Sequence, residues 1–368
     1  MAQPDRPSED KTSRRKLRAL LPSIAAGLVI GALGSIGARQ IGLPLPNLLG
    51  PLILCAIVTL AGITLTPLPG GREIGQVVVG LAIGLRLLPE VLQTILGLLP
   101  AMILATIGVV IVTMAAGLLL RHMTGIDRAT AYFATAPVGL AEMASLAHAR
   151  GGAADITSLV HTIRVSAMVT AVPLLVTWFG RDGGIITHHV GHRGEWVDLI
   201  LLMAISAAAA FFLKRLRLPN AWLLIPIIIG ALAAATGLTS VGMPSPLLVV
   251  AQVVIGIWLG CRFRRAMLTK LPRVTIAACL TTLLLLIAAA AGAALLASLT
   301  DVSFETSFLS LAPGGVTEMV LTASILHLDV PVISAFHLVR ILLLTSFSLV
   351  LFRVFEAMSR RLDGTAQS

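Results

Sequence analysis

Two matching sets of residues that could carry chemistry stand out in this apolar chain. Each set places a proline five residues and a glycine three residues before a glutamate, with a His-x-x-Arg pair further along. The first set is Pro137, Gly139, Glu142, His161 and Arg164, and the second is Pro313, Gly314, Gly315, Glu318, His337 and Arg340. Proline lacks the amide hydrogen that a helix needs, and glycine adopts backbone angles that other residues avoid. Each set therefore predicts a broken helix with an ionisable side chain beside the break.

The glutamates indicate an ion-binding function at the two breaks. A half-helix that begins after Pro137 or Pro313 would point free amide groups and its positive dipole end toward an anion or a substrate carboxylate. The carbonyl groups that end the preceding half-helix could bind Na⁺ or receive a proton. Because an ionisable side chain within a bilayer is costly, we interpret Glu142 and Glu318 as the groups that carry a coupling ion.

The histidine and arginine of each set lie on one helix face, because they are three positions apart. An arginine keeps its charge, so inside a bilayer it needs a carboxylate, a cluster of backbone carbonyl groups or an anionic substrate. Two interpretations stay open for Arg164 and Arg340: a structural ion pair with the glutamate of the same set, or a grip on substrate anions. His161 and His337 could carry protons or make ordinary hydrogen bonds.

Composition indicates a membrane protein. Hydrophobic residues make up 57% of the 368 residues and charged residues 12%, whereas a soluble domain usually has about 25% charged residues. The net charge of +10 does not indicate nucleic acid, because most Lys and Arg residues stand beside apolar stretches, as in cytoplasmic membrane loops. The sequence has no phosphate-binding Gly-x-x-x-x-Gly-Lys-Ser/Thr motif and no hydrolase motif, so neither ATP-driven pumping nor enzyme catalysis is expected.

The membrane part occurs twice along the sequence. Leu43–Pro51 recurs as Leu218–Pro226, and Gln76 with Gly80, Gly84 and Arg86 recurs as Gln252 with Gly256, Gly260 and Arg262. Gln76 and Gln252 open short apolar segments that could line a site, or they could make helix-end hydrogen bonds. Short or glycine-interrupted segments in corresponding positions are typical of the binding site of a secondary transporter.

These features predict an all-α integral membrane protein with two inverted repeats of five transmembrane helices, each with a broken, re-entrant helical hairpin. The predicted parts are a cytoplasmic N-tail (1–17), a first membrane repeat (18–179), a loop (180–195), a second repeat (196–352) and a cytoplasmic C-tail (353–368). The first repeat has expected spans near 18–38, 47–66, 73–87, 91–120 and 155–178, with its hairpin near 127–150. The second has expected spans near 196–213, 221–240, 246–261, 273–299 and 331–352, with its hairpin near 303–327.

Basic residues decide between two topologies. Re-entrant hairpins give ten crossings and inverted repeats, whereas hairpins that cross fully give twelve crossings and parallel repeats. With the N-tail inside, ten crossings place Lys214, Arg215 and Arg217 and the cluster between Arg262 and Arg273 in the cytoplasm, where Lys and Arg of short loops gather. Twelve crossings would place both groups outside. The first apolar stretch is longer than that of a signal peptide, so we expect it to remain as a span.

The other candidate ligands are interpreted as structural. Cys55, Cys261 and Cys279 lie in or beside apolar stretches without metal-site spacing. His188, His189 and His192 lie in the inter-repeat loop without further ligands. No metal or cofactor is expected, apart from coupling to Na⁺ or H⁺. The expected partners are the lipid bilayer and a small solute, not nucleic acid, and glycine-rich helix faces allow a homodimer without requiring one.

With these motifs the chain resembles the AbrB family of internally duplicated bacterial inner-membrane proteins. The resemblance rests on the Leu43–Pro51 and Leu218–Pro226 segments, the two Gln-x-x-x-Gly segments and the Ala312–Met319 hairpin, and it covers Ala19–Phe352. It implies an inner-membrane location. Family members are labelled regulators of gene expression or ammonia monooxygenases. A monooxygenase would need a copper or iron site, and the intramembrane histidines lie in opposite repeats without companion ligands. The two copies differ where Val138 replaces Gly314 and Asn47 replaces Trp222, so equal roles are not implied.

The sequence therefore favours a secondary transporter that moves a small anionic or polar solute with H⁺ or Na⁺. Glu142 and Glu318 would couple the ion, and Arg164 and Arg340 would orient the solute. The alternative is a membrane-embedded regulator or sensor that affects gene expression indirectly, without net transport. Uptake of solute by reconstituted protein would separate the two.

Overall fold

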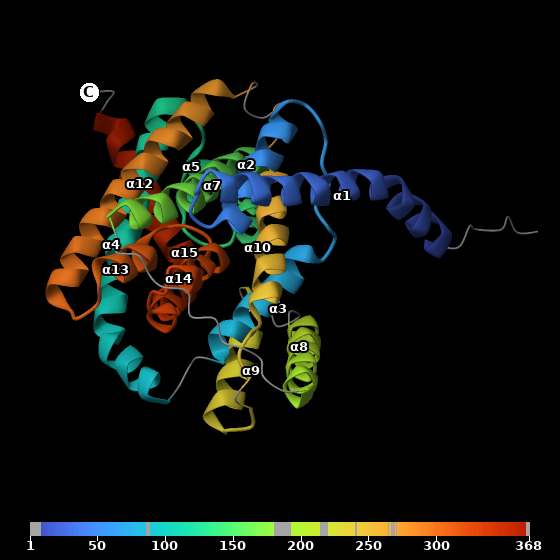
Figure 1. Ribbon diagram of the computed structural model, residues 1–368. Coiled ribbons are helices and arrows are strands. Elements are labelled where there is room, and N and C mark those ends of the chain that lie inside the picture. The colour runs from blue at the N-terminus through green and yellow to red at the C-terminus, as the bar shows by residue number, and fades with distance from the viewer. Residues whose placement is uncertain are drawn as a thin grey trace, which may run out of the picture. The chain divides into compact units, whose positions relative to one another are not determined.

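The computed structural model describes residues 9–85, 89–179, 193–213, 220–239, 241–263, 265, 269 and 271–365. All regular elements in these residues are helices (Figure 1). The first half contains α1 (Glu9–Gln40), α2 (Pro46–Leu60), α3 (Gly71–Gly84), α4 (Pro89–Thr124), α5 (Arg128–Thr135), α6 (Leu140–Ala149) and α7 (Ala154–Phe179). The second contains α8 (Arg193–Leu213), α9 (Ala221–Ala235), α10 (Ser245–Gly260), α12 (Pro272–Leu299), α13 (Phe304–Leu311), α14 (Val316–Ile325) and α15 (Val330–Thr365). Taken in order, the two lists correspond helix for helix.

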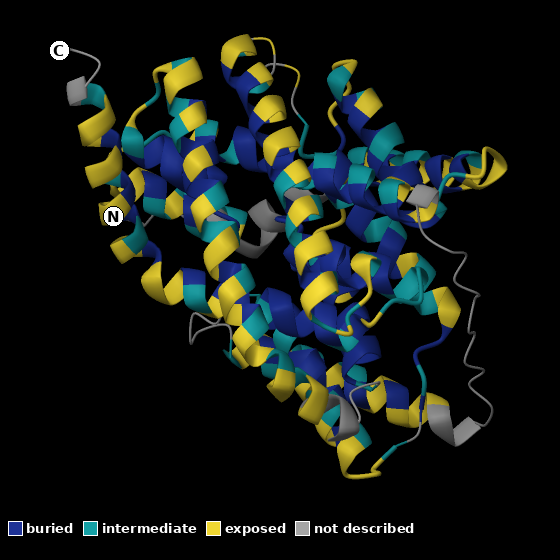
Figure 2. Ribbon diagram, turned by 90° about the vertical axis from the view of Figure 1, so that its left-hand side faces the viewer, coloured by how far each residue is buried: buried dark blue, intermediate teal, exposed yellow. Residues whose placement is uncertain are grey.

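Six helices in the described part of the chain are long and apolar enough to cross a membrane. They are Leu20–Gln40, Gln93–Thr124, Ala154–Thr177, Trp196–Leu213, Pro272–Leu299 and Val330–Asp363. These belong to α1, α4 and α7 and to their counterparts α8, α12 and α15. Exposed residues run along the long helices in Figure 2, and many are large and apolar, such as Leu104 and Ile111. Such exposure suits lipid rather than water, so the prediction of an all-helical, multi-pass membrane protein is confirmed.

Several predicted boundaries need correction. The spans predicted near 47–66 and 221–240 end at Leu60 and Ala235, because Gly62 and Gly237 take positive φ angles of 103° and 65° that end a helix. The helix α15 continues through most of the predicted C-tail, to Thr365. Likewise α1 begins within the predicted N-tail and α8 within the predicted loop. The rest of that loop, with the cluster His188, His189 and His192, lies outside the described residues, as do Arg86 and the cluster 214–217.

The chain forms two compact units, and the smaller comprises Met1–Gly75 and Val249–Arg265. In this unit α1 packs along α2, and Gly34 and Gly50 let the two backbones touch, because a Cβ on Gly34 would lie 2.5 Å from the Gly50 carbonyl oxygen. The helix α10 lies on α2 in the same way, with Gly256 against the backbone of Leu48.

The larger unit contains Gln76–Leu248 and Ala266–Ser368. Its long helices α4, α7, α12 and α15 pack around the short helices α5, α6, α13 and α14. Here α3 lies on α9, because a Cβ on Gly80 would come 2.5 Å from the carbonyl oxygen of Leu223. In each unit, therefore, the glycine-rich third helix of one half packs on the second helix of the other half. The units cut across the predicted repeats.

Both pairs of short helices are hairpins, as the broken motifs predict. The N-terminus of α5 is capped by Asp127, whose carboxylate accepts a hydrogen bond from the Thr130 amide at 2.8 Å. The Thr130 hydroxyl in turn accepts a bond from the Ala153 amide at 2.7 Å, which brings the two ends of the α5–α6 pair together. In the second pair, the capping residue Ser303 and the post-α14 residue Leu328 line the same cavity. Each chain segment thus returns to the end at which it began.

Candidate functional site

The tip of each hairpin is the predicted break. In the first, α5 ends at Thr135 and α6 begins after Gly139, with Pro137 between them. In the second, α13 ends at Leu311 and α14 begins after Gly315. Since proline cannot donate a backbone hydrogen bond, neither helix can continue through the tip.

Each glutamate of the two sets stands at the third position of the second short helix. Glu318 is 4% exposed, whereas Glu142 is partly buried with a buried Oε2 that has no hydrogen-bond partner. Both carboxylates fold back over the first turn: a Cβ on Gly139 would lie 3.4 Å from the Glu142 Oε2, and a Cβ on Gly315 would overlap the Glu318 carboxylate. Their charges therefore lie at the positive ends of α6 and α14.

Arg164 binds the end of the first short helix. Its guanidinium group donates to the carbonyl oxygens of Thr135 at 2.5 Å and Ala136 at 3.2 Å, and it lies 2.9 Å from Nε2 of His161. Arg164 is only 2% exposed. Because these carbonyl groups form the negative end of α5, they supply the partner that a buried arginine needs.

Arg340 makes the equivalent contacts in the second hairpin. It donates to the carbonyl oxygen of Ala312 at 3.0 Å and bonds to Nδ1 of His337. The Nε2 of His337 lies 3.0 Å from the carbonyl oxygen of Leu309, so His337 links Arg340 to a second carbonyl group of α13. The helix α14 of the second hairpin packs against α7, which carries Arg164. The second hairpin therefore lies beside the helix that binds the first hairpin.

These contacts change how the arginines are interpreted. Among the ion pairs of the described residues, none joins Arg164 to Glu142 or Arg340 to Glu318. The carbonyl groups of Thr135, Ala136 and Ala312, which could bind Na⁺ or receive a proton, accept hydrogen bonds from guanidinium groups in this structure. The predicted role in holding substrate stays a prediction, and the atoms left for it are the Nε atoms of both arginines, which are buried without a hydrogen-bond partner.

Gln76 connects the first half to the second hairpin. Its side chain is 2% exposed and donates to the Oδ1 of Asn220 at 3.1 Å and the Oγ1 of Thr317 at 3.0 Å. Thr317 directly precedes Glu318, so Gln76 lies beside the second break, and its role in lining a binding site stays a prediction. Gln252 is buried in α10 of the smaller unit.

Asn220 and Thr317 were not singled out from the sequence. A usable signal was present for Asn220, which follows Leu218-Pro219 and begins α9 with a positive φ of 56°, an angle that asparagine tolerates well. The counterpart of Thr317 in the first hairpin is Ala141, so nothing in the duplication marks the hydroxyl. Only the hydrogen bond from Gln76 in the structure singles out Thr317.

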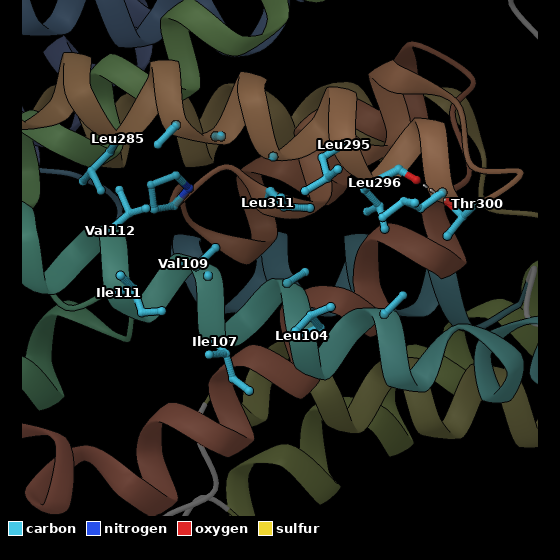
Figure 3. Close-up of a pocket in the computed structure, with 18 residues that line it drawn as sticks. Leu104, Ile107, Val109, Ile111, Val112, Leu285, Leu295, Leu296, Thr300 and Leu311 are labelled. Carbon is cyan, nitrogen blue, oxygen red and sulfur yellow. Dashed lines mark hydrogen bonds between the residues drawn. The ribbon is translucent and has the colours of Figure 1, made fainter.

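Two cavities border the second hairpin. One of about 560 Å³ lies between α4 and α12 and reaches Leu311 and Pro313 at the hairpin tip (Figure 3). It is lined almost wholly by apolar side chains such as Leu104, Leu285 and Leu295. The other, of about 660 Å³, lies at the hairpin base and has both polar and apolar residues in its lining. It is lined by Thr94, Gly97, Leu98, Thr300, Asp301, Val302, Ser303, Thr306, His327, Leu328, Asp329 and Val332.

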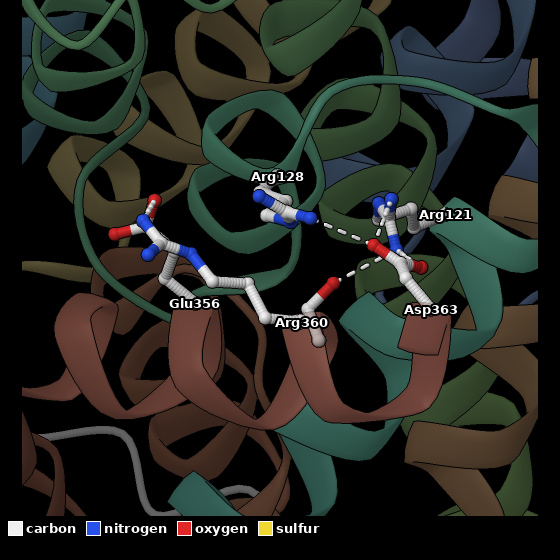
Figure 4. A network of polar contacts seen from close by, with 6 residues as sticks. Arg121, Arg128, Glu356, Arg360 and Asp363 are labelled. Carbon is white, nitrogen blue, oxygen red and sulfur yellow. Dashed lines mark hydrogen bonds and ion pairs between the residues drawn. The ribbon is translucent and has the colours of Figure 1, made fainter. Parts of the chain in front are cut away.

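The first hairpin is packed tightly instead. Its Tyr132 and Phe133 rings contact Phe352 with centroid distances of 5.5 and 5.2 Å, and the cavity beside Pro137 holds only about 10 Å³. At its base, Arg121 and Arg128 converge on one carboxylate near the end of α15. Figure 4 shows both guanidinium groups pointing at Asp363, at 2.6 and 2.7 Å. The C-terminal end of α15 is therefore bound to the base of this hairpin through the two ion pairs of Asp363.

Metal ligands do not gather in this region. Across the described residues, no three His, Cys, Asp or Glu side chains are close enough to hold a metal ion. The polar groups at the breaks are instead carboxylates at helix N-termini, arginines on carbonyl groups and one amide. Such a set can bind a small ion or solute through hydrogen bonds and charge.

Comparison with known proteins agrees with the motifs. Residues 65–356 match the family described as transition state regulatory protein AbrB. The chain belongs to the AbrB family. Over 343 residues it is 27% identical to the protein YhjN of Bacillus subtilis (strain 168), covering 86% of this chain and 88% of that one. Over 320 residues it is 26% identical to a protein of Escherichia coli (strain K12) named "Putative regulator AbrB", covering 85% and 90%. The family match includes both hairpins and both arginines.

Proposed function

We propose that this AbrB-family protein is a secondary transporter that moves a small anionic or polar solute together with H⁺ or Na⁺. One observation carries the proposal: each of the two hairpins has a glutamate at the start of its second helix, and α14 of the second hairpin packs against α7, which carries Arg164. An ionisable side chain beside a broken membrane helix is a functional group by default, because burying it without a purpose is costly. In this proposal Glu142 and Glu318 carry the coupling ion, and Gln76 and Thr317 contact the solute.

The proposed topology has ten crossings, inverted repeats and both termini in the cytoplasm of a bacterial inner membrane. Two observations support it. Each hairpin returns to its starting end and so adds no crossing, which leaves an odd number of spans per half. In addition, the third helix of each half packs on the second helix of the other half. The helix α3 packs on α9, and α10 packs on α2. The distribution of basic residues gives the direction.

The unequal packing of the two hairpins supports alternating access. The cavity at the base of the second hairpin offers a route from one side, while the base of the first is closed by the contacts of Asp363 and Phe352. In the proposed topology these bases face opposite sides of the membrane. The structure would then be one of two states, and opening the other side requires Asp363 to separate from Arg121 and Arg128.

The test is uptake by purified protein reconstituted in liposomes, with metabolite anions offered singly under a sodium or proton gradient. We expect at least one anion to give gradient-driven uptake, and Glu318→Gln to abolish the dependence on the gradient. Glu305→Gln, in α13 of the same hairpin but at its base, is the matched control and should transport normally. Full ion-driven uptake by Glu318→Gln would refute the coupling role.

The second candidate is a membrane-embedded regulator without net transport. The name of the Escherichia coli relative favours it, and such a protein would affect gene expression through a bound solute or partner. It predicts that the solute raises the thermal midpoint of the protein while no liposome accumulates solute. We propose no catalytic activity and no cofactor for the chain.

A further inference from the structure

Cys55 and Cys261 come together in the smaller unit, although they are far apart in sequence. Cys55 lies in α2 of the first half and is fully buried, and Cys261 directly follows α10 of the second half and is half-buried. Cys261 packs against the cluster that contains Cys55, Ile257 and Leu65, and the Cys55 thiol also lies 4.0 Å from the carbonyl oxygen of Gly27 in α1.

The backbone around Cys261 fits a covalent bond to Cys55. Gly260 has no side chain, and a Cβ built on it would lie 2.8 Å from the Cβ of Cys55 and 2.6 Å from the Leu52 carbonyl oxygen. The chain just before Cys261 therefore lies directly against Cys55. A disulfide needs Cα atoms within about 7 Å and thiols that face each other, and the close approach of Gly260 to Cys55 places the neighbouring Cys261 beside it.

We propose that Cys55 and Cys261 form a reversible disulfide when the protein meets a peroxide. Cys261 is less buried than Cys55, so it reacts first: its sulfur takes one oxygen from hydrogen peroxide, giving a sulfenic acid and one water. The Cys55 thiol then attacks that sulfur, forming the S–S bond and releasing a second water. A thiol reductant returns both cysteines to the free form.

The disulfide would join the two halves of the chain, because it fixes α2 to the end of α10. The proposed topology places Cys261 on the cytoplasmic side, where thiols are kept reduced, so the bond would form under oxidative conditions only. This placement rests on the proposed topology. The bond itself depends only on the contact within the smaller unit, and its test does not use transport.

The experiment counts free thiols in the full-length protein before and after hydrogen peroxide. The protein is unfolded in SDS and labelled with a polyethylene glycol maleimide. Each labelled cysteine raises the apparent molecular mass on a gel by one resolvable increment. We expect three adducts before oxidation, since Cys55, Cys261 and Cys279 are all free, one adduct after it, and three again after a thiol reductant. Cys279, which is exposed on α12, is the internal reference.

Single variants separate this pair from general oxidation. Cys261→Ser should keep two adducts after peroxide, Cys55→Ser should lose only the adduct of Cys261, which is held as a sulfenic acid that dimedone labels, and Cys279→Ser should fall from two to none. Three adducts in the oxidised wild-type protein would overturn the proposal, as would an equal loss of adducts in Cys55→Ser. If a serine variant fails to fold, a Cys55–Cys261 cross-linked peptide in a digest of the wild-type protein decides the question, and its absence refutes the bond.

Discussion

Gly315→Ala should move the carboxylate of Glu318 away from the start of α14 without disturbing the fold. A Cβ on Gly315 would come closer than 3.0 Å to that carboxylate, a distance that Cβ atoms do not tolerate. The backbone accepts alanine, because Gly315 has φ of −73° and ψ of 138°. The flexible end of the Glu318 side chain is therefore the part that must rotate away.

The magnitude follows from the burial of Glu318. A negative charge at a helix N-terminus stabilises by about 0.3–1 kcal/mol when exposed and by up to about 2 kcal/mol when partly buried. Since Glu318 is 4% exposed, the loss should lie near the upper value, about 2 kcal/mol. Gly139→Ala is the matched control. Gly139 begins α6 with the same role, but its Cβ would lie 3.4 Å from the Glu142 Oε2, an ordinary contact.

The assay is reversible unfolding in mixed detergent micelles, with the free energy of unfolding measured for each variant. Both variants replace a glycine that caps a helix, so the capping cost cancels in their difference. The remaining difference should be about 2 kcal/mol, and it should vanish when Gly315→Ala is made in a Glu318→Gln background. Equal losses for the two glycine variants, or an undiminished loss in the Glu318→Gln background, would refute the reasoning.

Three further predictions concern packing and polar contacts. Gly84→Ala should abolish monodisperse protein in size-exclusion chromatography, because its Cβ would strike backbone atoms of α9. Gly108→Ala, whose Cβ meets nothing within 4 Å, should elute normally, and identical profiles would contradict this packing. Gln76→Leu removes two buried hydrogen bonds and should lower the free energy of unfolding by about 2–3 kcal/mol in the same micelle assay; an unchanged value would show that these bonds are not formed. Asp363→Asn should change the free energy of unfolding little, because its pair with Arg121 is partly exposed, yet trypsin should cut the end of α15 faster. High salt should have the same effect on the wild-type protein, and a salt-independent rate would rule out the ionic contact.

The sequence by itself determined the class of the protein, the order of its helices and the places where they break. These features depend on local signals, and each acts within a few residues. Pro137 removes an amide hydrogen wherever it stands, and Gly62 ends a helix by its own backbone angle. The duplication made these signals stronger, since each break and each short helix is encoded twice.

Only the tertiary structure decided what the buried polar side chains bind. Arg164 could have paired with Glu142, and the spacing allowed it, yet the hairpin brings the carbonyl groups of Thr135 and Ala136 closer. Gln76 found its partners in the second half of the chain for the same reason. Helix packing decides which groups distant in the sequence become hydrogen-bond partners, and it depends on many weak contacts together. No short sequence pattern predicts the combined effect of those contacts.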